Sequence, residues 1–397
     1  MKKLFILSGL AAGLFFQGCK TVQKTGPSVQ SQPDTTEKVD SVLAQTPLVS
    51  DTLLDTKDIE DFTLEVWIEE KDTLSIIGVG DMMLGTNFPN EGYLPPNEGR
   101  ALLADVHRIL QNADITFGNL EGVMLDSGGT QKTCQNPDLC YLFRSPERYI
   151  QRFVEAGFDM VSLANNHAGD FGNEGRNRTM RVVEEAGIAH AGQLAQPTCV
   201  VTHEGVRYGM VAFSPNSGTV SIHDIENAKR LVQQLDSISD IIIVSFHGGA
   251  EGSKFQHVKR TSEMFYGENR GNVYEFAHAM IDAGADIIFG HGPHVTRSID
   301  LYKDRFIIYS LGNFCTYARF NLRGENGIAP IIKVYTDREG KFLKGHITPI
   351  IQYGEGGVSI DANNGAIKTL QKLLKEDFPE VPLDIDEGGN ITYIHAE

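Results

Sequence analysis

Two histidines, His291 and His294, are separated by two residues and follow the short apolar run Asp286–Phe289. Open α/β sheets build their sites from side chains at the carboxyl ends of strands. Imidazole is a ligand for zinc, iron, nickel and manganese, so this pair predicts half of a metal site. A His-x-x-His pair also fits an ordinary hydrogen-bonded loop, and the interpretation depends on what else the chain places beside it.

Other ligand-type residues follow separate apolar runs along the chain. They are Asp81 after 74–80, Asn119 and Glu121 after 114–118, Asn166 and His167 after 159–164, and His247 after 241–246. Each one alone fits ordinary loop content. Five junctions that all carry carboxylate, amide or imidazole groups are hard to attribute to chance. They predict that one edge of a sheet gathers oxygen and nitrogen ligands around one or two divalent ions.

Amphipathic segments between these runs supply the elements that would position the ligands. The sequence predicts helices over 102–110, 146–156, 174–185, 225–235, 273–282 and 366–375, and further strands over 188–190, 206–213 and 305–311. Strands that alternate with helices indicate α/β layers. Two later runs, 327–335 and 342–352, predict an antiparallel pair. Asp170 is interpreted as the cap of a helix that begins near Asn173.

Composition limits the class of protein. The 397 residues are enough for one large or two ordinary domains, and 41% hydrophobic residues are typical of a globular chain. The formal net charge of −17 argues against nucleic acid as a partner. The chain contains no Gly-x-x-x-x-Gly-Lys loop, no Gly-x-Ser-x-Gly elbow and no His-Glu-x-x-His motif, so P-loop, serine-type and zincin hydrolysis lack support.

The N-terminal residues predict export and a lipid anchor. Residues 1–19 combine two lysines, an apolar run from Leu4 to Phe16 that is shorter than the roughly 20 residues of a membrane span, and Cys19. Gly18-Cys19 resembles the lipobox of bacterial lipoproteins, whose cysteine is acylated; ordinary signal cleavage with an incidental cysteine is the alternative. Residues 20–72, with five lysines and twelve acidic residues, are interpreted as a disordered acidic linker.

The remaining chain divides into a domain over 73–353 and a C-terminal extension over 354–397. Cys134 and Cys140 flank five residues and could close a small disulfide loop in an oxidising compartment. Two free thiols are the alternative.

Six sequence blocks resemble the CapA family of capsule and poly-γ-glutamate biosynthesis proteins. They are Gly80–Gly85, Gly118–Gly122, Ala164–Gly172, His247–Glu251, Gly290–Val295 and Tyr309–Phe314, in the family's order. That family in turn resembles calcineurin-like metallophosphoesterases. The resemblance implies a four-layer α/β/β/α sandwich.

The resemblance also implies a role for each ligand-type residue. Asp81 matches the first metal-binding aspartate, Glu121 or Asn119 the bridging carboxylate, and Asn166 and His167 the pair in which the amide binds metal and the imidazole faces the substrate. His247 matches a lone metal-binding histidine. His291 and His294 match the final Gly-His-x-His block, although one extra residue separates them here.

Met83 departs from the phosphoesterase pattern, because it stands where the Asp-x-His block has its histidine. Methionine is a poor ligand for hard divalent ions. The sequence therefore predicts a site for manganese, zinc or iron that holds one ion well and a second poorly or not at all.

The chemistry implied by such a centre is hydrolysis. A bound divalent ion supplies hydroxide at neutral pH and polarises a phosphoryl or acyl oxygen. His167 would protonate the leaving group, and Glu251 would orient a ligand or bind substrate, unless it is only a solvated loop carboxylate.

The resemblance implies a lipid-anchored protein of the bacterial cell envelope, periplasmic or on the surface, that serves synthesis, export or anchoring of an anionic capsular polymer. The hydrolase version acts on phosphoester or amide links. One alternative is a non-catalytic scaffold for polymer-synthase subunits in the membrane. Another is a phosphodiesterase or phosphatase unrelated to capsule.

Overall fold

The computed structural model describes residues 21–23, 71–134 and 140–394. Cys19, the predicted signal segment and residues 24–70 of the predicted linker lie outside the described residues, so acylation and the disorder of residues 24–70 stay predictions. Residues 21–23, which also fall within the predicted linker, instead form a strand. No helix among the described residues is long and apolar enough to cross a bilayer.

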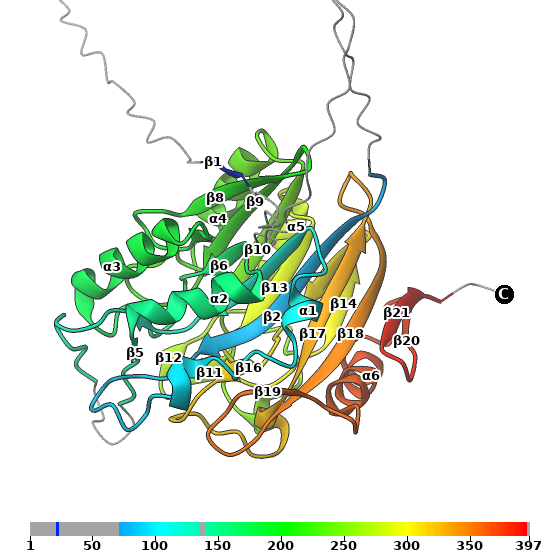
Figure 1. Ribbon diagram of the computed structural model, residues 1–397. Coiled ribbons are helices and arrows are strands. Elements are labelled where there is room, and N and C mark those ends of the chain that lie inside the picture. Colours follow the sequence, from blue (N-terminus) through cyan, green and yellow to red (C-terminus); the bar gives the residue numbers. More distant parts are fainter. Residues whose placement is uncertain (1–20, 24–70, 135–139, 395–397) are drawn as a thin grey trace, which may run out of the picture. The chain divides into compact units, whose positions relative to one another are not determined.

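Two β-sheets form the centre of the folded unit (Figure 1). The strand order of the first is β1 (Thr21–Gln23), β8 (Thr198–His203), β9 (Val206–Phe213), β10 (Ile241–His247), β13 (Ile287–His291), β15 (Arg305–Ile308) and β14 (Ile299–Tyr302). The second runs β20 (Leu383–Ile385), β21 (Asn390–Tyr393), β18 (Phe342–Gln352), β17 (Ile328–Thr336), β2 (Leu74–Met83), β3 (Ile115–Leu120), β6 (Met160–Ser162) and β7 (Ala189–Ala191). In addition, β16 (Asn313–Thr316) pairs with β2, and β19 (Val358–Ile360) pairs with β18.

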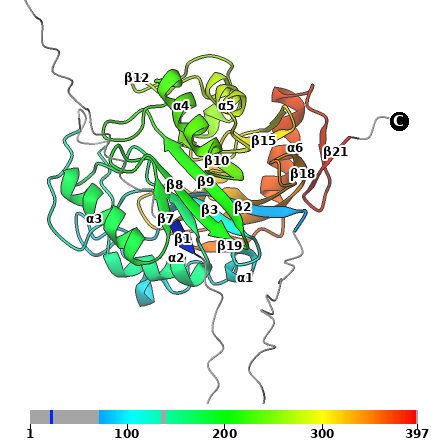
Figure 2. The same cartoon turned by 90° about the horizontal axis from the view of Figure 1, so that it is seen from above.

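Helices cover the outer faces of both sheets. The helices are α1 (His107–Leu110), α2 (Ile150–Ala156), α3 (Gly172–Glu185), α4 (Ile225–Asp236), α5 (Val273–Asp282) and α6 (Gly365–Asp377). Figure 2 shows α4 and α5 on one side of the sheets, and α1 and α2 on the other. Short 3-10 turns lie at Pro96–Gly99, Glu147–Tyr149, Ser253–Phe255 and Gly324–Gly327, and two-stranded ribbons pair Val123–Met124 with Arg144–Ser145 and Met264–Phe265 with Glu268–Asn269.

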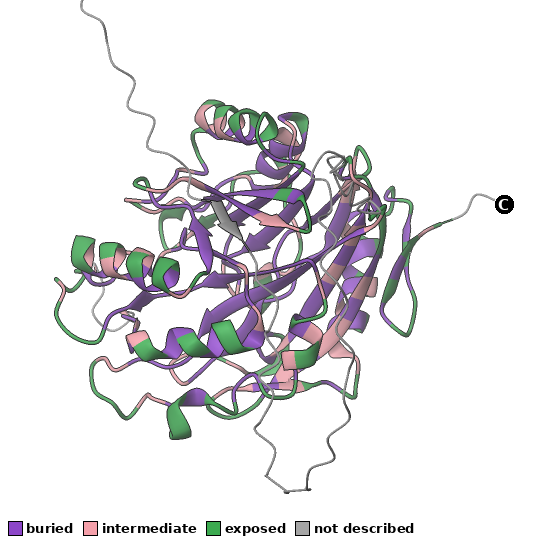
Figure 3. Cartoon of the chain, turned by 45° about the horizontal axis from the view of Figure 1, so that its top comes forward, coloured by how far each residue is buried: buried purple, intermediate pink, exposed green. Residues whose placement is uncertain are grey.

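Alternation along the strands of the second sheet explains the layers. Ile76 packs into the core between the two sheets, whereas its neighbour Ile77 packs into a separate core beneath α1 and α2. Successive strand side chains point to opposite faces, so one apolar run serves both layers. Phe117 of β3 stacks on Phe289 of β13 with centroids 5.4 Å apart, which joins the sheets directly. The predicted four-layer α/β/β/α sandwich is confirmed, and Figure 3 shows its buried strands and half-exposed helices.

Local sequence explains the elements that lead to the site. All seven residues of β10 are buried, as expected for a continuous apolar run in a parallel sheet covered on both faces. Asp224 caps α4 by accepting from Asn227 N at 3.1 Å, and Asn272 caps α5 by accepting from Glu275 N at 3.2 Å. The predicted antiparallel pair is confirmed as β17 and β18.

The helix predicted over 102–110 is wrong over most of its length. Only His107–Leu110 is helical, and the residues before it form successive turns. Leu102 and Leu103 are both buried although they are adjacent, and Leu102 O accepts a hydrogen bond from Val358 N at 2.8 Å. A regular helix would point adjacent side chains about 100° apart, so tertiary packing overrides the helical pattern here.

The C-terminal segment completes the second sheet. β21 pairs with β18, and α6 packs along β17 and β18 and reaches β14 of the first sheet. Elsewhere, Cys134 and Cys140 form a disulfide with a Cα–Cα separation of 5.7 Å, which confirms the predicted bridge.

Candidate metal centre

The register within the sheets places the predicted ligands at matching levels. In the first sheet, His247 at the end of β10 pairs with His291 at the end of β13. In the second, Asp81 of β2 pairs with Asn119 of β3 and with Asn313 of β16. These pairings are parallel, so the carboxyl ends of the strands meet at one edge of the sandwich.

Two glycines let the loops at this edge approach closely. A Cβ on Gly80 would lie 1.9 Å from Gly312 O, and without one Asp81 N donates to that carbonyl at 2.9 Å. Gly292 has a φ of 113°, and a Cβ there would lie 2.8 Å from Gly248 N. Gly248 N donates at 2.8 Å to His291 O. These contacts hold the ligand-bearing loops of β2, β10 and β13 in place.

The side chains of Asp81, Glu121 and His294 converge. One ligand atom from each lies within 4.8 Å of the other two. His294 Nδ1 is 2.9 Å from Asp81 Oδ2, and its Nε2 is 3.7 Å from Glu121 Oε1. His291 Nδ1 lies 3.3 Å from Asp81 Oδ1, but not in hydrogen-bond geometry.

Several buried ligand atoms at this edge have no hydrogen-bond partner among the described residues. They are both carboxylate oxygens of Glu121, both ring nitrogens of His247 and His291, and Oδ1 of Asn166. Leaving buried polar atoms unpaired is costly, and native proteins rarely do so without a reason. Carboxylate, imidazole and amide donors together suit manganese, zinc or iron. The residues therefore fit a divalent ion held by Asp81, Glu121, Asn166, His247, His291 and His294.

The pKa values of the cluster follow from its burial and from the charges that its members exert on one another. Burial and the negative charge of Asp81 raise the pKa of Glu121 well above its usual range. Burial lowers the pKa of His247, so this imidazole is neutral, as a metal ligand must be. Burial opposes the charged forms of Asp81 and His294 too, yet their contact lowers the pKa of Asp81, and Glu121 and Asp81 raise that of His294 to about 10. A divalent cation would compensate the two buried carboxylates.

The side-chain amide of Asn119 is hydrogen-bonded at both ends. Its Nδ2 donates to Asp81 Oδ1 at 2.9 Å, and its Oδ1 accepts from Asn165 Nδ2 at 3.1 Å. Of the two alternatives for the bridging carboxylate, Glu121 is thus the residue with free oxygens. Asn165 also holds His167, whose backbone N–H donates to Asn165 Oδ1 at 3.1 Å.

His167 is held by Asp170, a contact that the sequence reasoning missed. His167 Nδ1 lies 2.7 Å from Asp170 Oδ2, and Asp170 is fully buried. The carboxylate accepts, so Nδ1 carries the proton. The other ring nitrogen, Nε2, lies 3.9 Å from Glu121 Oε1. Phe143 stacks on the imidazole at 4.1 Å and its N–H donates to the same Asp170 oxygen at 2.8 Å.

The predicted capping role of Asp170 is wrong. Helix α3 begins at Gly172 with Phe171 at its N-cap, and no side chain caps it. Asp170 faces inward because the imidazole and the Phe143 N–H both need its carboxylate, and Lys132 Nζ lies 3.6 Å from its other oxygen. The three-residue spacing from His167 was the available signal.

Two further asparagines hold His294 and were assigned no role from the sequence. Asn313 Oδ1 lies 3.1 Å from His294 Nδ1, and Asn313 Nδ2 donates to Asn326 O at 3.0 Å. Asn326 Nδ2 donates to His294 O at 3.1 Å. These bonds fix a residue whose φ of 57° is unusual for a non-glycine.

Met83 does not take the place of a metal-binding histidine. It is fully buried, and its sulfur accepts a hydrogen bond from Gly85 N at 3.2 Å. The thioether is therefore already engaged by the backbone of its own strand end, which favours a single strongly held ion.

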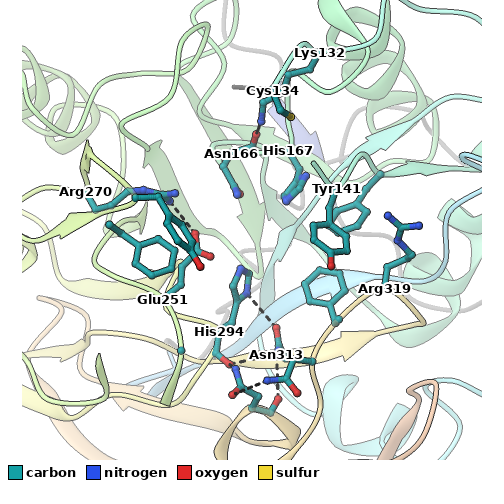
Figure 4. Close-up of a pocket in the computed structure, with 17 residues that line it drawn as sticks. Lys132, Cys134, Tyr141, Asn166, His167, Glu251, Arg270, His294, Asn313 and Arg319 are labelled. Atoms are coloured by element: carbon teal, nitrogen blue, oxygen red, sulfur yellow. Dashed lines mark hydrogen bonds and ion pairs between the residues drawn. The ribbon is translucent and has the colours of Figure 1, made fainter. Parts of the chain in front are cut away.

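A cavity of about 490 Å³, here called the central cleft, opens above the cluster. Its lining includes Asn166, His167, Glu251, Arg270, His294 and Asn313 (Figure 4). Arg270 Nη1 lies 3.0 Å from Glu251 Oε1. Glu251 is thus an ion-paired wall residue of the cleft, and it faces the space in which a substrate would lie.

Comparison with known proteins points to one family. The family described as "Bacterial capsule synthesis protein PGA_cap" matches residues 75–318. The capsule biosynthesis protein CapA of Bacillus anthracis is 30% identical over 267 residues, covering 62% of this chain and 60% of that protein. The PGA biosynthesis protein CapA of Bacillus subtilis is 27% identical over 259 residues, covering 61% and 63%. The chain thus spans about 60% of the length of these curated relatives.

Solved structures show more distant likenesses. A putative 5'-nucleotidase from Staphylococcus aureus has a TM-score of 0.39 at 15% identity and is covered over 53% of its length by 73% of this chain. The purple acid phosphatase PPD1 of yellow lupin has a TM-score of 0.36 at 12% identity with the same coverages. Likenesses at these TM-scores carry no conclusion about activity.

Proposed function

The chain belongs to the PGA_cap family of bacterial capsule synthesis proteins, and from that premise we propose that it is a metal-dependent hydrolase that acts on an anionic polymer of the poly-γ-glutamate type. Its place of action is the bacterial cell envelope, where acylated Cys19 anchors it. Polymer-synthase subunits are its expected neighbours in the membrane.

The observation that carries the proposal is the set of orphaned ligand atoms at the foot of the central cleft. Glu121, His247 and His291 present buried oxygens and nitrogens that have no partner among the described residues. A structural core would pair or omit such groups, because an unpaired buried carboxylate is destabilising. A centre that has lost its ion through evolution would be expected to lose several of these residues together, and the chain retains all of them.

The ion and the residues around it would have different roles in the reaction. The bound ion would lower the pKa of a coordinated water and polarise the scissile carbonyl or phosphoryl oxygen. Asp170 fixes the tautomer of His167, so Nε2 is the nitrogen directed at the centre. In its protonated form, His167 gives that proton to the leaving amine or alcohol, while Asp170 stabilises the imidazolium. Glu251 and Arg270 bind the polar groups of the substrate from the opposite wall.

A non-catalytic scaffold is the second candidate, and Met83 favours it. The engagement of the Met83 sulfur by Gly85 N removes one ligand that two-metal phosphoesterases use. A centre with one ion would still bind a polymer and would hold a synthase subunit without cleaving the chain.

Metal analysis of the purified full chain tests the proposal. The hydrolase hypothesis predicts bound manganese, zinc or iron, and cleavage of poly-γ-glutamate or of a phosphodiester after that metal is supplied. Substitution of His291 and His294 together by alanine should remove both. Bound metal without cleavage of either substrate favours the scaffold, and absence of bound metal with all three ions supplied contradicts the metal centre itself.

A further inference from the structure

The central cleft continues into a second cavity. This neighbouring cavity of about 630 Å³, here called the outer cavity, shares Tyr141, Arg319, Phe320 and Asn321 with the lining of the central cleft. Its remaining wall includes Arg323 and Gly354. A path therefore leads from the metal centre past Arg319 to Arg323. The path leaves space for the parts of a substrate that lie beyond the bond being cleaved, and a small ester would not fill this space.

Arg319 lies at the junction with its charge uncompensated. Its guanidinium carbon lies 4.8 Å from the ring centre of Tyr93 and 4.9 Å from that of Tyr141. Within the described part of the chain, no carboxylate lies within ion-pair distance of it, and its buried Nε has no hydrogen-bond partner. Two aromatic contacts thus hold the guanidinium in one place while its N–H donors stay free, as an anion-binding group requires.

The other cations of the central cleft are already paired. Arg270 contacts Glu251 at 3.0 Å and Glu268 at 3.1 Å. Lys132 Nζ lies 3.6 Å from Asp170 and donates to Asn166 O at 2.9 Å. Arg319 lies across the cleft from the Glu251–Arg270 pair (Figure 4). A negatively charged group of a bound molecule would therefore find an unpaired cation only at Arg319 among the described residues that line the central cleft.

The backbone around Arg319 is strained. Ala318 and Arg319 have consecutive positive φ values of 53° and 39°, which L-residues with a Cβ rarely adopt. Strain of this kind persists where the surroundings hold it, and it clusters at ligand sites. Here it turns the Arg319 side chain to the junction of the two cavities.

Arg323 supplies a second cation at the far end of the path. It is exposed, and no described carboxylate lies within ion-pair distance of it. Its backbone N–H donates to Asn321 Oδ1 at 3.2 Å, which fixes the turn that carries it. Two such arginines on one short loop stand out in a chain whose net charge is −17.

We propose that Arg319 and Arg323 form an anion path that holds a chain of repeating carboxylates while one link of that chain lies at the metal centre. This inference rests on the proposed function, because it assigns the part of the polymer that is not being cleaved to a defined surface. It makes the site selective for an extended polyanion over a single small substrate.

Binding measurements on the full chain with γ-linked glutamate oligomers test the inference. Free glutamate serves as the single-unit probe, and oligomers of increasing length extend along the path. The dissociation constant of the wild-type protein should fall with length. Arg319→Gln should weaken binding of long oligomers about tenfold and Arg323→Gln about threefold, with little change for free glutamate. Arg108→Gln is the matched control, because Arg108 is exposed on α1 and forms no ion pair with a described residue.

The outcomes separate this inference from the proposed function. Length-dependent binding that both substitutions leave unchanged overturns the anion path and leaves the polymer substrate in place. Failure of the wild-type protein to bind any oligomer overturns the polymer substrate itself, and the anion path with it. Tighter binding of inorganic polyphosphate with the same arginine dependence overturns the carboxylate assignment. Unchanged metal content and melting temperature in both variants exclude loss of the fold as the cause.

Discussion

Replacement of Arg297 by methionine should strongly destabilise the protein. Arg297 and Glu263 are both almost completely buried and form a bidentate pair, with Nη1–Oε1 and Nη2–Oε2 distances of 2.8 and 2.9 Å. Arg297 Nη2 also donates to Ala250 O at 3.0 Å, and Ala250 N donates to Glu263 Oε2 at 3.0 Å. The pair thus ties the loop after His294 to the loop that carries Glu251.

The magnitude follows from what remains after the substitution. Removal of the guanidinium leaves the Glu263 carboxylate buried with a single backbone donor. Breaking a buried ion pair in this way costs about 3–5 kcal/mol. For a folded unit of about 320 residues, an unfolding entropy of about 0.7 kcal/mol/K converts this cost into a melting temperature lower by about 4–7 °C.

Urea unfolding of a double-mutant cycle is the assay. Arg297→Met together with Glu263→Leu removes both charges, and this variant should recover at least about 2 kcal/mol relative to Arg297→Met alone. Arg207 and Asp240 give the matched control, since they form a bidentate pair at the surface. Arg207→Met should cost less than about 1 kcal/mol. The reasoning is refuted if Arg297→Met costs no more than Arg207→Met, or if the double variant is less stable than Arg297→Met.

Three further predictions concern metal, proton transfer and pH. A saturating metal should stabilise the wild type by about 2.7 kcal/mol when the free metal is a hundred times the dissociation constant, and Glu121→Gln should abolish the resulting rise in melting temperature. An equal rise in both proteins, measured by calorimetry after chelation and reloading, would contradict the role of Glu121 as a ligand. Asp170→Asn should lower the hydrolysis rate at least about a hundredfold at unchanged metal content, because a neutral amide can donate to Nδ1 as well as accept from it and no longer stabilises the imidazolium of His167; an unchanged rate would show that the contact is only structural. Burial lowers the pKa of His190 to about 4, so the unfolded chain binds the proton first as the pH falls. The stability that is present above about pH 6.5 is therefore lost progressively down to about pH 4, by up to about 3 kcal/mol. Urea midpoints between pH 7 and pH 4 should therefore decline less steeply in His190→Leu than in the wild type, and parallel declines would refute the assignment.

Some long-range features were predictable because one pattern repeats. Each buried run had the length and composition of a strand with both faces covered, and each ended in a ligand-type residue, as β10 does with His247. Parallel strands have their carboxyl ends at the same edge of a sheet, so the grouping of Asp81 with Glu121 followed from fold class. The convergence of that group with His291 and His294 depends on how the two sheets pack together.

Other features of the site depend on contacts between segments that no local pattern connects. The sequence left Asn119 and Glu121 as alternatives, and only the placement of Asn165 shows that the Asn119 oxygen is already occupied. Aspartate is a common helix N-cap residue, but the Asp170 carboxylate accepts a hydrogen bond from Phe143 N and lies against His167 instead.

What the sequence determined by itself is what short-range sterics and hydrophobic periodicity encode: the alternation of strands and helices, the α/β layers that it indicates, and the type of side chain at each strand end. What only the tertiary structure decided is which polar groups are paired and which are left free. Arg297 finds Glu263 across 34 residues, whereas Arg319 is held between Tyr93 and Tyr141 and finds no carboxylate. The cost of burying a charge depends on every neighbour within a few ångströms, and those neighbours are set by the way the two sheets and their loops pack together.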